Sequence, residues 1–318
     1  MSNELKMGTP IGRPAIIVVI GVLLLFIAFV LSPQLLIQLG PMRGSLTSEL
    51  GNVRVIAEAE IMAARLLIAI AGLVLVAIWV FWRQFSVSRL NRWLVTPLQV
   101  KEHGALFNRP AFYMLSATAL ILGWIAIAGI YPQSLPRVVR REDGLFEYLT
   151  ALLFLGASVT AFLNARKARR QVERFVLYSL AIGFLVCVAE EISWGQRLFG
   201  FETPENLQAF NVQDEINLHN SLGYAADHIF IAGVFLYGVL LPILVRRYTA
   251  FANLAFWTGL PVASLGLALG WAAASGLHDW TVYYVLPKTP LRVAEAREMI
   301  SALGFFLLML EIRKKLRG

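Results

Sequence analysis

Long uninterrupted runs of apolar residues constrain this chain more than any other feature of its sequence. The hydrocarbon core of a bilayer is roughly 30 Å thick, so a helix that crosses it needs about twenty apolar residues. Eight segments approach that length, near residues 14–35, 61–82, 111–131, 145–165, 175–194, 225–245, 253–275 and 294–312. We therefore expect an all-α polytopic integral membrane helical bundle that forms a single transmembrane domain over residues 1–318.

The composition excludes an ordinary soluble domain, because 58% of the residues are hydrophobic and only 15% are charged. The first apolar run, from Pro14 to Leu39, is too long for a signal peptide, and no small-residue cleavage site follows it. We expect it to remain as the first helix. The single cysteine, Cys187, excludes an intrachain disulfide and any metal site made of several thiolates.

The basic residues indicate the topology. Eight spans put both termini on one side, and an inside N-terminus makes 1–13, 83–110, 164–174, 246–252 and 313–318 the inner segments. These segments hold eighteen of the 28 Lys and Arg residues, which favours an N-in/C-in arrangement. The net charge of +8 then reflects contact with lipid headgroups, and we expect no nucleic-acid partner. The run Arg166, Lys167, Arg169 and Arg170 is interpreted as a stop-transfer flank, with a specific lipid-headgroup site as the alternative.

Several acidic residues fall within the expected membrane depth. The fifth segment is free of charge only from Phe175 to Ala189, about 22 Å of helix, and the eighth only from Met299 to Leu310, about 18 Å. Glu190, Glu191 and Glu298 are therefore drawn to the outer boundary or below it. Such carboxylates are costly and by default indicate a functional site, with structural ion pairs to arginine as the alternative. The second-tier candidates at this side are Glu147, Glu298, Asp279 and His228.

The residues just after the fifth segment form the densest polar feature. If the helix continues there, Glu190 and Arg197 lie seven residues apart on one face with Trp194 between them, which favours an ion pair under an aromatic side chain. Glu191 points elsewhere and is then available as an acid, a base or a ligand.

A second polar stretch follows in the outer loop 195–224. Between residues 211 and 219, polar side chains alternate with others, which in an extended chain places five of them on one face. In a helix, Glu215 and His219 would still meet at i, i+4. Either geometry suits a polyhydroxylated or phosphorylated headgroup, and an ordered capping loop is the alternative. The candidate substrate-binding residues are Trp194, Gln196, Asn211, Gln213, Asn217 and Asn220.

Three of the four histidines, His219, His228 and His278, map to the outer side. Together with the carboxylates they could ligate a divalent metal, the one cofactor that we consider, with His219, His278 and Glu191 as the candidate ligands. Their spacing matches no compact ligand motif, so simple interfacial histidines are the alternative.

The string EEISWGQRLFGFETPENLQAFNVQDEINLHN, which begins at Glu190, resembles a block of uncharacterised bacterial multipass membrane proteins. In that family GEEISWGQR precedes a TP helix and an NLHN end, and Ala189 here replaces the glycine. The resemblance implies a bacterial cytoplasmic (inner) membrane protein but transfers no activity. The outward histidines and acids are also loosely similar to membrane hydrolases of the alkaline ceramidase type, although the paired-histidine helix is absent.

Three hypotheses for the function follow. The first is a membrane-embedded enzyme whose site faces the periplasm or exterior and acts on a lipid or lipid-linked substrate by acid/base or metal-assisted hydrolysis or transfer. The second is an ion-coupled transporter or permease, and the third is a non-catalytic envelope-assembly protein. The candidate catalytic residues of the enzyme are Glu190, Glu191, Arg197, Glu215, His219 and His278.

Overall fold

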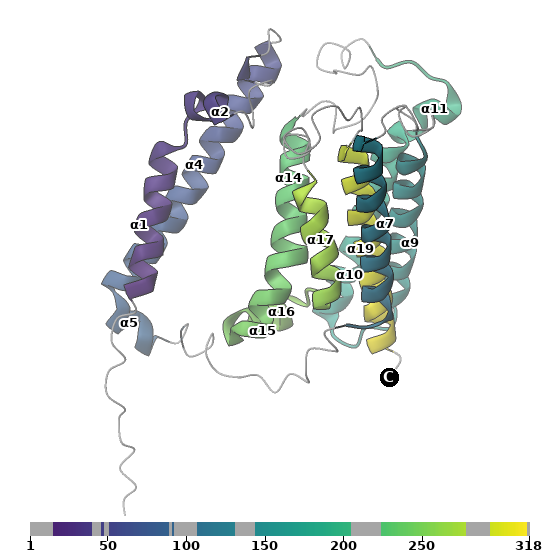
Figure 1. Ribbon diagram of the computed structural model, residues 1–318. Helices are drawn as coiled ribbons and strands as arrows, with labels where there is room; N and C mark the ends of the chain where they lie inside the picture. The colour runs from purple at the N-terminus through teal and green to yellow at the C-terminus, as the bar shows by residue number, and fades with distance from the viewer. Residues whose placement is uncertain are drawn as a thin grey trace, which may run out of the picture. The chain divides into compact units, whose positions relative to one another are not determined.

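The computed structural model describes residues 15–39, 46–47, 51–88, 91, 107–130, 144–204, 224–277 and 293–316. Every regular element within these ranges is helical, so the all-α prediction is confirmed there. The contacts divide the chain into two compact units, residues 1–93 and 94–318 (Figure 1). Each unit is described by itself, and the single transmembrane domain stays a prediction.

The first unit is a helical hairpin. It contains α1 (Ala15–Val30), α2 (Pro33–Leu39), α4 (Gly51–Val80) and α5 (Trp82–Val87). α1 and α4 approach closely at Gly21 and Gly72, where a Cβ on Gly72 would lie 2.8 Å from the Gly21 carbonyl oxygen. Small residues allow such close contact between membrane helices. The helix expected over 14–35 ends instead at Val30, because a proline at 33 cannot continue it.

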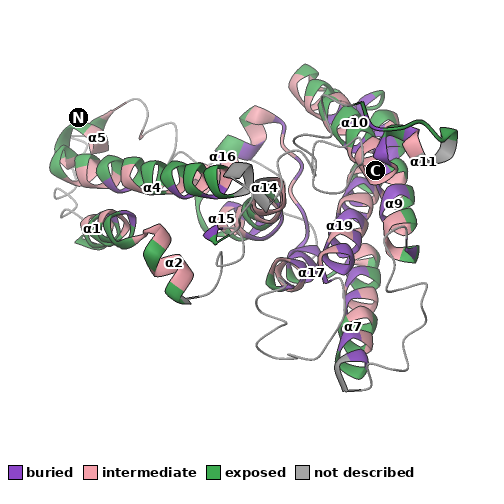
Figure 2. Cartoon of the chain, turned by 90° about the horizontal axis from the view of Figure 1, so that it is seen from above, coloured by how far each residue is buried: buried purple, intermediate pink, exposed green. Residues whose placement is uncertain are grey.

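The second unit is built around one buried helix. Its elements are α7 (Arg109–Ile130), α9 (Leu145–Ala165), α10 (Gln171–Glu191), η2 (Ser193–Gly195), α11 (Gln196–Phe199), α14 (Tyr224–Val234), η3 (Phe235–Leu240), α15 (Leu241–Arg247), α16 (Thr249–Thr258), α17 (Leu265–Gly276) and α19 (Val293–Lys315). α19 packs against α7, α9 and α17. Figure 2 shows α19 in the buried colour over much of its length.

Trp271 of α17 lies at the centre of this packing. It is fully buried, its indole N–H donates to the Ser301 carbonyl at 3.1 Å, and its ring lies 5.2 Å from that of Phe305. Glycines make room for it, since a Cβ on Gly238 or Gly304 would meet the indole at 2.6 or 2.5 Å. The core therefore consists of large aromatic side chains seated against glycine-bearing helices.

Five of the described helices are long and apolar enough to cross a membrane: Arg54–Val80, Arg109–Ala128, Leu145–Ala165, Gln171–Glu191 and Ala226–Arg247. Ala15–Val30 and Leu265–Gly276 are apolar but shorter. The chain thus has the helices of an integral membrane protein, whereas eight spans and the N-in/C-in topology stay predictions.

The continuous helix expected over 253–275 is wrong. α16 ends at Thr258, Gly259 has a left-handed φ of 69°, and α17 begins only at Leu265. Pro261 lies in the break and cannot donate a helical hydrogen bond. Side chains of neighbouring helices donate to two carbonyls of the break. The Tyr237 hydroxyl donates to the Pro261 carbonyl at 2.8 Å, and the Arg246 guanidinium donates to the Ala263 carbonyl at 3.1 Å.

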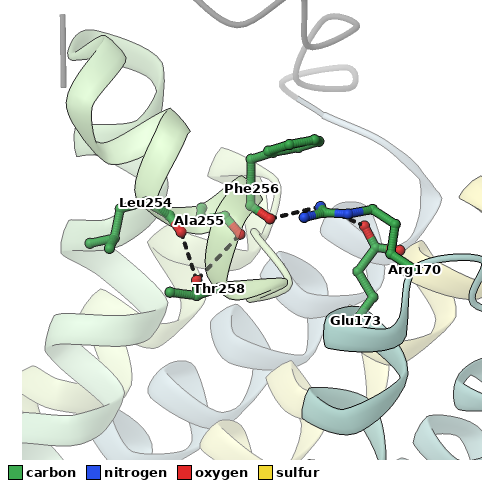
Figure 3. Close-up of polar contacts among 6 residues, drawn as sticks. All are labelled: Arg170, Glu173, Leu254, Ala255, Phe256 and Thr258. Carbon is green, nitrogen blue, oxygen red and sulfur yellow. Dashed lines mark hydrogen bonds and ion pairs between the residues drawn. The ribbon is translucent and has the colours of Figure 1, made fainter. Parts of the chain in front are cut away.

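An arginine also ties α16 to the start of α10 (Figure 3). Arg170 donates to the Phe256 carbonyl at 2.7 Å and to Glu173 at 3.1 Å, and its guanidinium lies 3.8 Å from the centroid of the Phe256 ring. Gly259 packs on the backbone of Val172 and Glu173. These contacts give the break a defined structure between two helices.

Candidate functional site

Acidic side chains of three helices gather at one end of the second unit, which we call the acidic end. They are Glu147 in the first turn of α9, Glu190 and Glu191 at the end of α10, and Glu295 and Glu298 near the start of α19. α9 packs against both α10 and α19. In Figure 1 this end is marked by α11, which follows α10, and is opposite the C-terminus of α19. The helix directions therefore bring together carboxylates that are distant in sequence.

Glu191 is the centre of this group. Its carboxylate lies within electrostatic reach of those of Glu298, Glu147, Glu295 and Glu190. Glu191 and Glu147 are half-buried, Glu298 has 17% of its side chain exposed, and Glu295 is buried. Neighbouring carboxylates in a partly buried site favour a shared proton, a cation or a basic partner. Four of the sequence candidates, Glu147, Glu190, Glu191 and Glu298, thus lie in one place.

A buried arginine accompanies the carboxylates. Arg297 has 1% of its side chain exposed, forms an ion pair with Asp227 of α14 and donates to the Leu277 carbonyl at 3.1 Å. It also lies 4.0 Å from Glu298. A buried guanidinium needs such partners. The sequence suggested that arginines could pair with the glutamates, but it gave no sign that Arg297 pairs with Asp227, which is 70 residues away.

The chain turns sharply after Glu191. Ser193, Trp194 and Gly195 have φ values of 47°, 53° and 83°, a left-handed conformation that ends α10. The expectation that the helix continues, so that Glu190 and Arg197 share a face, is therefore wrong. The Trp194 indole N–H instead donates to Glu190 at 2.7 Å, while Trp194 remains 48% exposed.

Two consecutive left-handed residues other than glycine are rare and cost of order 1 kcal/mol or more each. Ser193 is buried at the base of this turn. Gln196, a candidate substrate-binding residue, donates to the Thr203 hydroxyl at 3.0 Å, and Thr203 is itself buried. The turn from 193 to 203 is thus held to the end of α10 by its own side chains.

Of the remaining candidates, the structure places only His228, which is half-buried near the start of α14, next to Asp227. Outside the described residues lie the Arg197 side chain and the whole of Asn211, Gln213, Glu215, Asn217, His219, Asn220, His278 and Asp279.

Metal binding also stays a prediction. Within the described part of the chain, no three His, Cys, Asp or Glu side chains are arranged to hold a metal ion. Two of the three candidate ligands, His219 and His278, lie outside that part, and Glu191 is the third.

These observations define a class, an all-helical protein with membrane-length helices and a cluster of carboxylates at one end of its larger unit. No protein-family model matches the chain, and neither a curated protein nor a solved structure matches it.

Proposed function

We propose that this protein is a membrane-embedded enzyme of the bacterial cytoplasmic membrane that acts on a lipid or lipid-linked substrate. Its eight spans would leave both termini inside, and the acidic end would face the periplasm or exterior. The reaction would be a hydrolysis or transfer assisted by acid/base groups or by a divalent metal.

The observation that carries this proposal is the convergence of carboxylates from α9, α10 and α19 around Glu191. Ionisable side chains at membrane depth are costly, and their grouping in a partly buried site is typical of proton-transfer or ligand-binding function. Arg297 pairs with Asp227 and lies 4.0 Å from Glu298, so this buried cation is shared between a structural ion pair and the glutamate cluster.

The roles follow from these contacts. Because the Trp194 indole engages Glu190, we assign the base to Glu191, which would accept the proton of an attacking water or hydroxyl. Arg197 would hold an anionic group of the substrate. His219 would donate a proton to the leaving group, and Glu215 and His278 would complete the site.

One observation favours a transporter as the second candidate. The break between α16 and α17 resembles the discontinuous helices that bind ions in transporters. In this chain, however, the carbonyls of Pro261 and Ala263 already accept hydrogen bonds from Tyr237 and Arg246. An envelope-assembly protein would need no grouping of the glutamates, so the convergence at Glu191 supports the enzyme over that alternative.

The proposal is tested by complementing a deletion strain and comparing its lipids and glycolipids. Glu191→Gln and His219→Ala, made at normal abundance, should leave the substrate accumulated, with turnover reduced about 100-fold or more. Glu202→Gln is the matched control, because Glu202 is an exposed glutamate of the same end that lies outside the cluster. Full restoration of the lipid profile by both test variants would show that the assignment is wrong.

A further inference from the structure

The opposite end of the second unit, which we call the basic end, carries a strongly positive surface. It includes the start of α7, the α9–α10 turn, the α15–α16 junction and the end of α19. These segments lie together, since Asn164 donates to the Met309 carbonyl at 2.8 Å and Arg170 to that of Phe256 at 2.7 Å. The exposed cations of this end are Arg109, Arg166, Lys167, Arg169, Arg174, Arg247, Lys314 and Lys315.

Among the described residues, few acidic side chains oppose this positive surface. Of the carboxylates described here, Glu173 pairs with Arg170 at 3.1 Å. Glu311 is buried and accepts hydrogen bonds from Asn108 at 2.7 Å and from the Ser264 hydroxyl at 2.6 Å. Glu173 is therefore paired and Glu311 is buried, whereas the exposed cations outnumber both.

The α9–α10 turn separates structural cations from exposed ones. Arg170 is used by the fold, through Glu173, the Phe256 carbonyl and the Phe256 ring (Figure 3). Its neighbours Arg166, Lys167 and Arg169 are exposed. Within the five residues from 166 to 170 the chain thus has one arginine bonded to the fold and three cations exposed on the surface.

Aromatic residues lie beside these cations. Tyr248, which precedes α16, is 52% exposed, and Trp257, which lies within α16, is 51% exposed. α16 has only ten residues and cannot cross a bilayer. Short segments with exposed aromatic and basic side chains are typical of the membrane–water interface.

We propose that the basic end binds the phosphate headgroups of anionic phospholipids, with Arg166, Lys167 and Arg169 as the main contacts. The charge is complementary, and the apolar helices α9 and α10 continue directly from this turn, so that acyl chains can lie along them. A free phosphate would use the cations alone, whereas a lipid also uses the adjacent apolar surface. This site is at the other end of the unit from Glu191 and is independent of the proposed function.

The test uses the full-length protein in vesicles of phosphatidylcholine with increasing phosphatidylglycerol. The measurement is the association constant for phosphatidylglycerol relative to phosphatidylcholine, obtained with brominated lipids that quench tryptophan fluorescence. Because each cation near an anionic surface contributes about fivefold, the triple variant Arg166→Gln, Lys167→Gln, Arg169→Gln should lower the selectivity of these sites roughly 100-fold. Inorganic phosphate at millimolar concentration should not compete.

Two variants serve as controls. Arg166→Lys with Arg169→Lys keeps the charge and should keep the lipid preference. Arg170→Gln removes internal contacts and should lower the melting temperature equally in both lipids without changing the preference. Equal association of the unchanged protein with both lipids, full preference in the triple variant, or displacement by inorganic phosphate would each overturn the proposal.

Discussion

The two ends of α19 use buried carboxylates in opposite ways. Near the C-terminal end of α19, Glu311 accepts hydrogen bonds from Asn108, from the Ser264 backbone N–H at 3.1 Å and from the Ser264 hydroxyl. Asn108 and Ser264 cap α7 and α17, so that Glu311 lies where helix N-termini favour a negative charge. Near its start, Glu298 and Glu295 lie among other carboxylates with Arg297 as the buried cation.

The surroundings of these carboxylates distinguish a structural residue from candidate functional ones. Glu311 is surrounded by donors that belong to the fold, which makes it a structural carboxylate. The glutamates of the acidic end lie close to further carboxylates, and the mutual repulsion of these charges is a cost that Glu311 does not bear. Three variants test the distinction.

The largest effect is expected for Arg297→Met. It leaves Asp227 without its cation in a buried site, and removing one partner of such a pair costs about 3 to 5 kcal/mol of unfolding free energy. Unfolding of the purified protein in mixed micelles with increasing denaturing detergent measures this loss. Arg54→Met is the control, because Arg54 pairs with Glu58 on an exposed surface and should change stability by about 0.5 kcal/mol or less. Equal effects of the two variants would contradict the structural role of Arg297.

A somewhat smaller loss is expected for Glu311→Ala. The variant removes the acceptor of three hydrogen bonds that join α7, α17 and α19, and we expect a loss of about 3 kcal/mol in the same unfolding measurement. Glu311→Gln keeps one acceptor oxygen and should lose less. A loss below about 1 kcal/mol for Glu311→Ala would mean that this end of α19 is not a structural junction.

The smallest effect on stability is expected for Glu298→Gln, which should not lower the unfolding free energy. The change weakens an attraction to Arg297 but removes repulsion from Asp227, Glu295 and Glu147. The unfolding free energy should stay the same or rise by at most about 1 kcal/mol. A loss as large as that of Glu311→Ala would place Glu298 among the structural residues and remove the contrast between the two ends.

The grouping of Glu190, Glu191 and Glu298 at one end of the unit could be predicted from sequence. The charge-free parts of the fifth and eighth segments are short for a bilayer span, so these glutamates were expected at one common end. The pair between Asp227 and Arg297 could not be predicted, because it depends on which of several helices α19 contacts.

Local backbone geometry was harder to predict. Gly259 and Pro261 are residues that often end a helix, but the apolar residues on both sides of them favoured one continuous helix over 253–275. The left-handed Ser193 and Trp194 had no signal at all, since residues with a Cβ rarely adopt that conformation. The ion pair between Glu190 and Arg197 was expected only if the helix continued between them, and the turn at Ser193 and Trp194 ends that helix.

We propose that Glu191 of the acidic end carries the function, whereas Glu311 at the other end of α19 is a structural carboxylate. The most direct test of this contrast is a paired measurement on Glu191→Gln and Glu311→Gln, recording both the unfolding free energy and the lipid profile of the complemented deletion strain. We predict that Glu191→Gln keeps its stability and fails to restore the lipids, whereas Glu311→Gln loses stability and, where it folds, restores them. A Glu191→Gln protein that restores the lipids fully, or that loses as much stability as Glu311→Gln, would contradict the account.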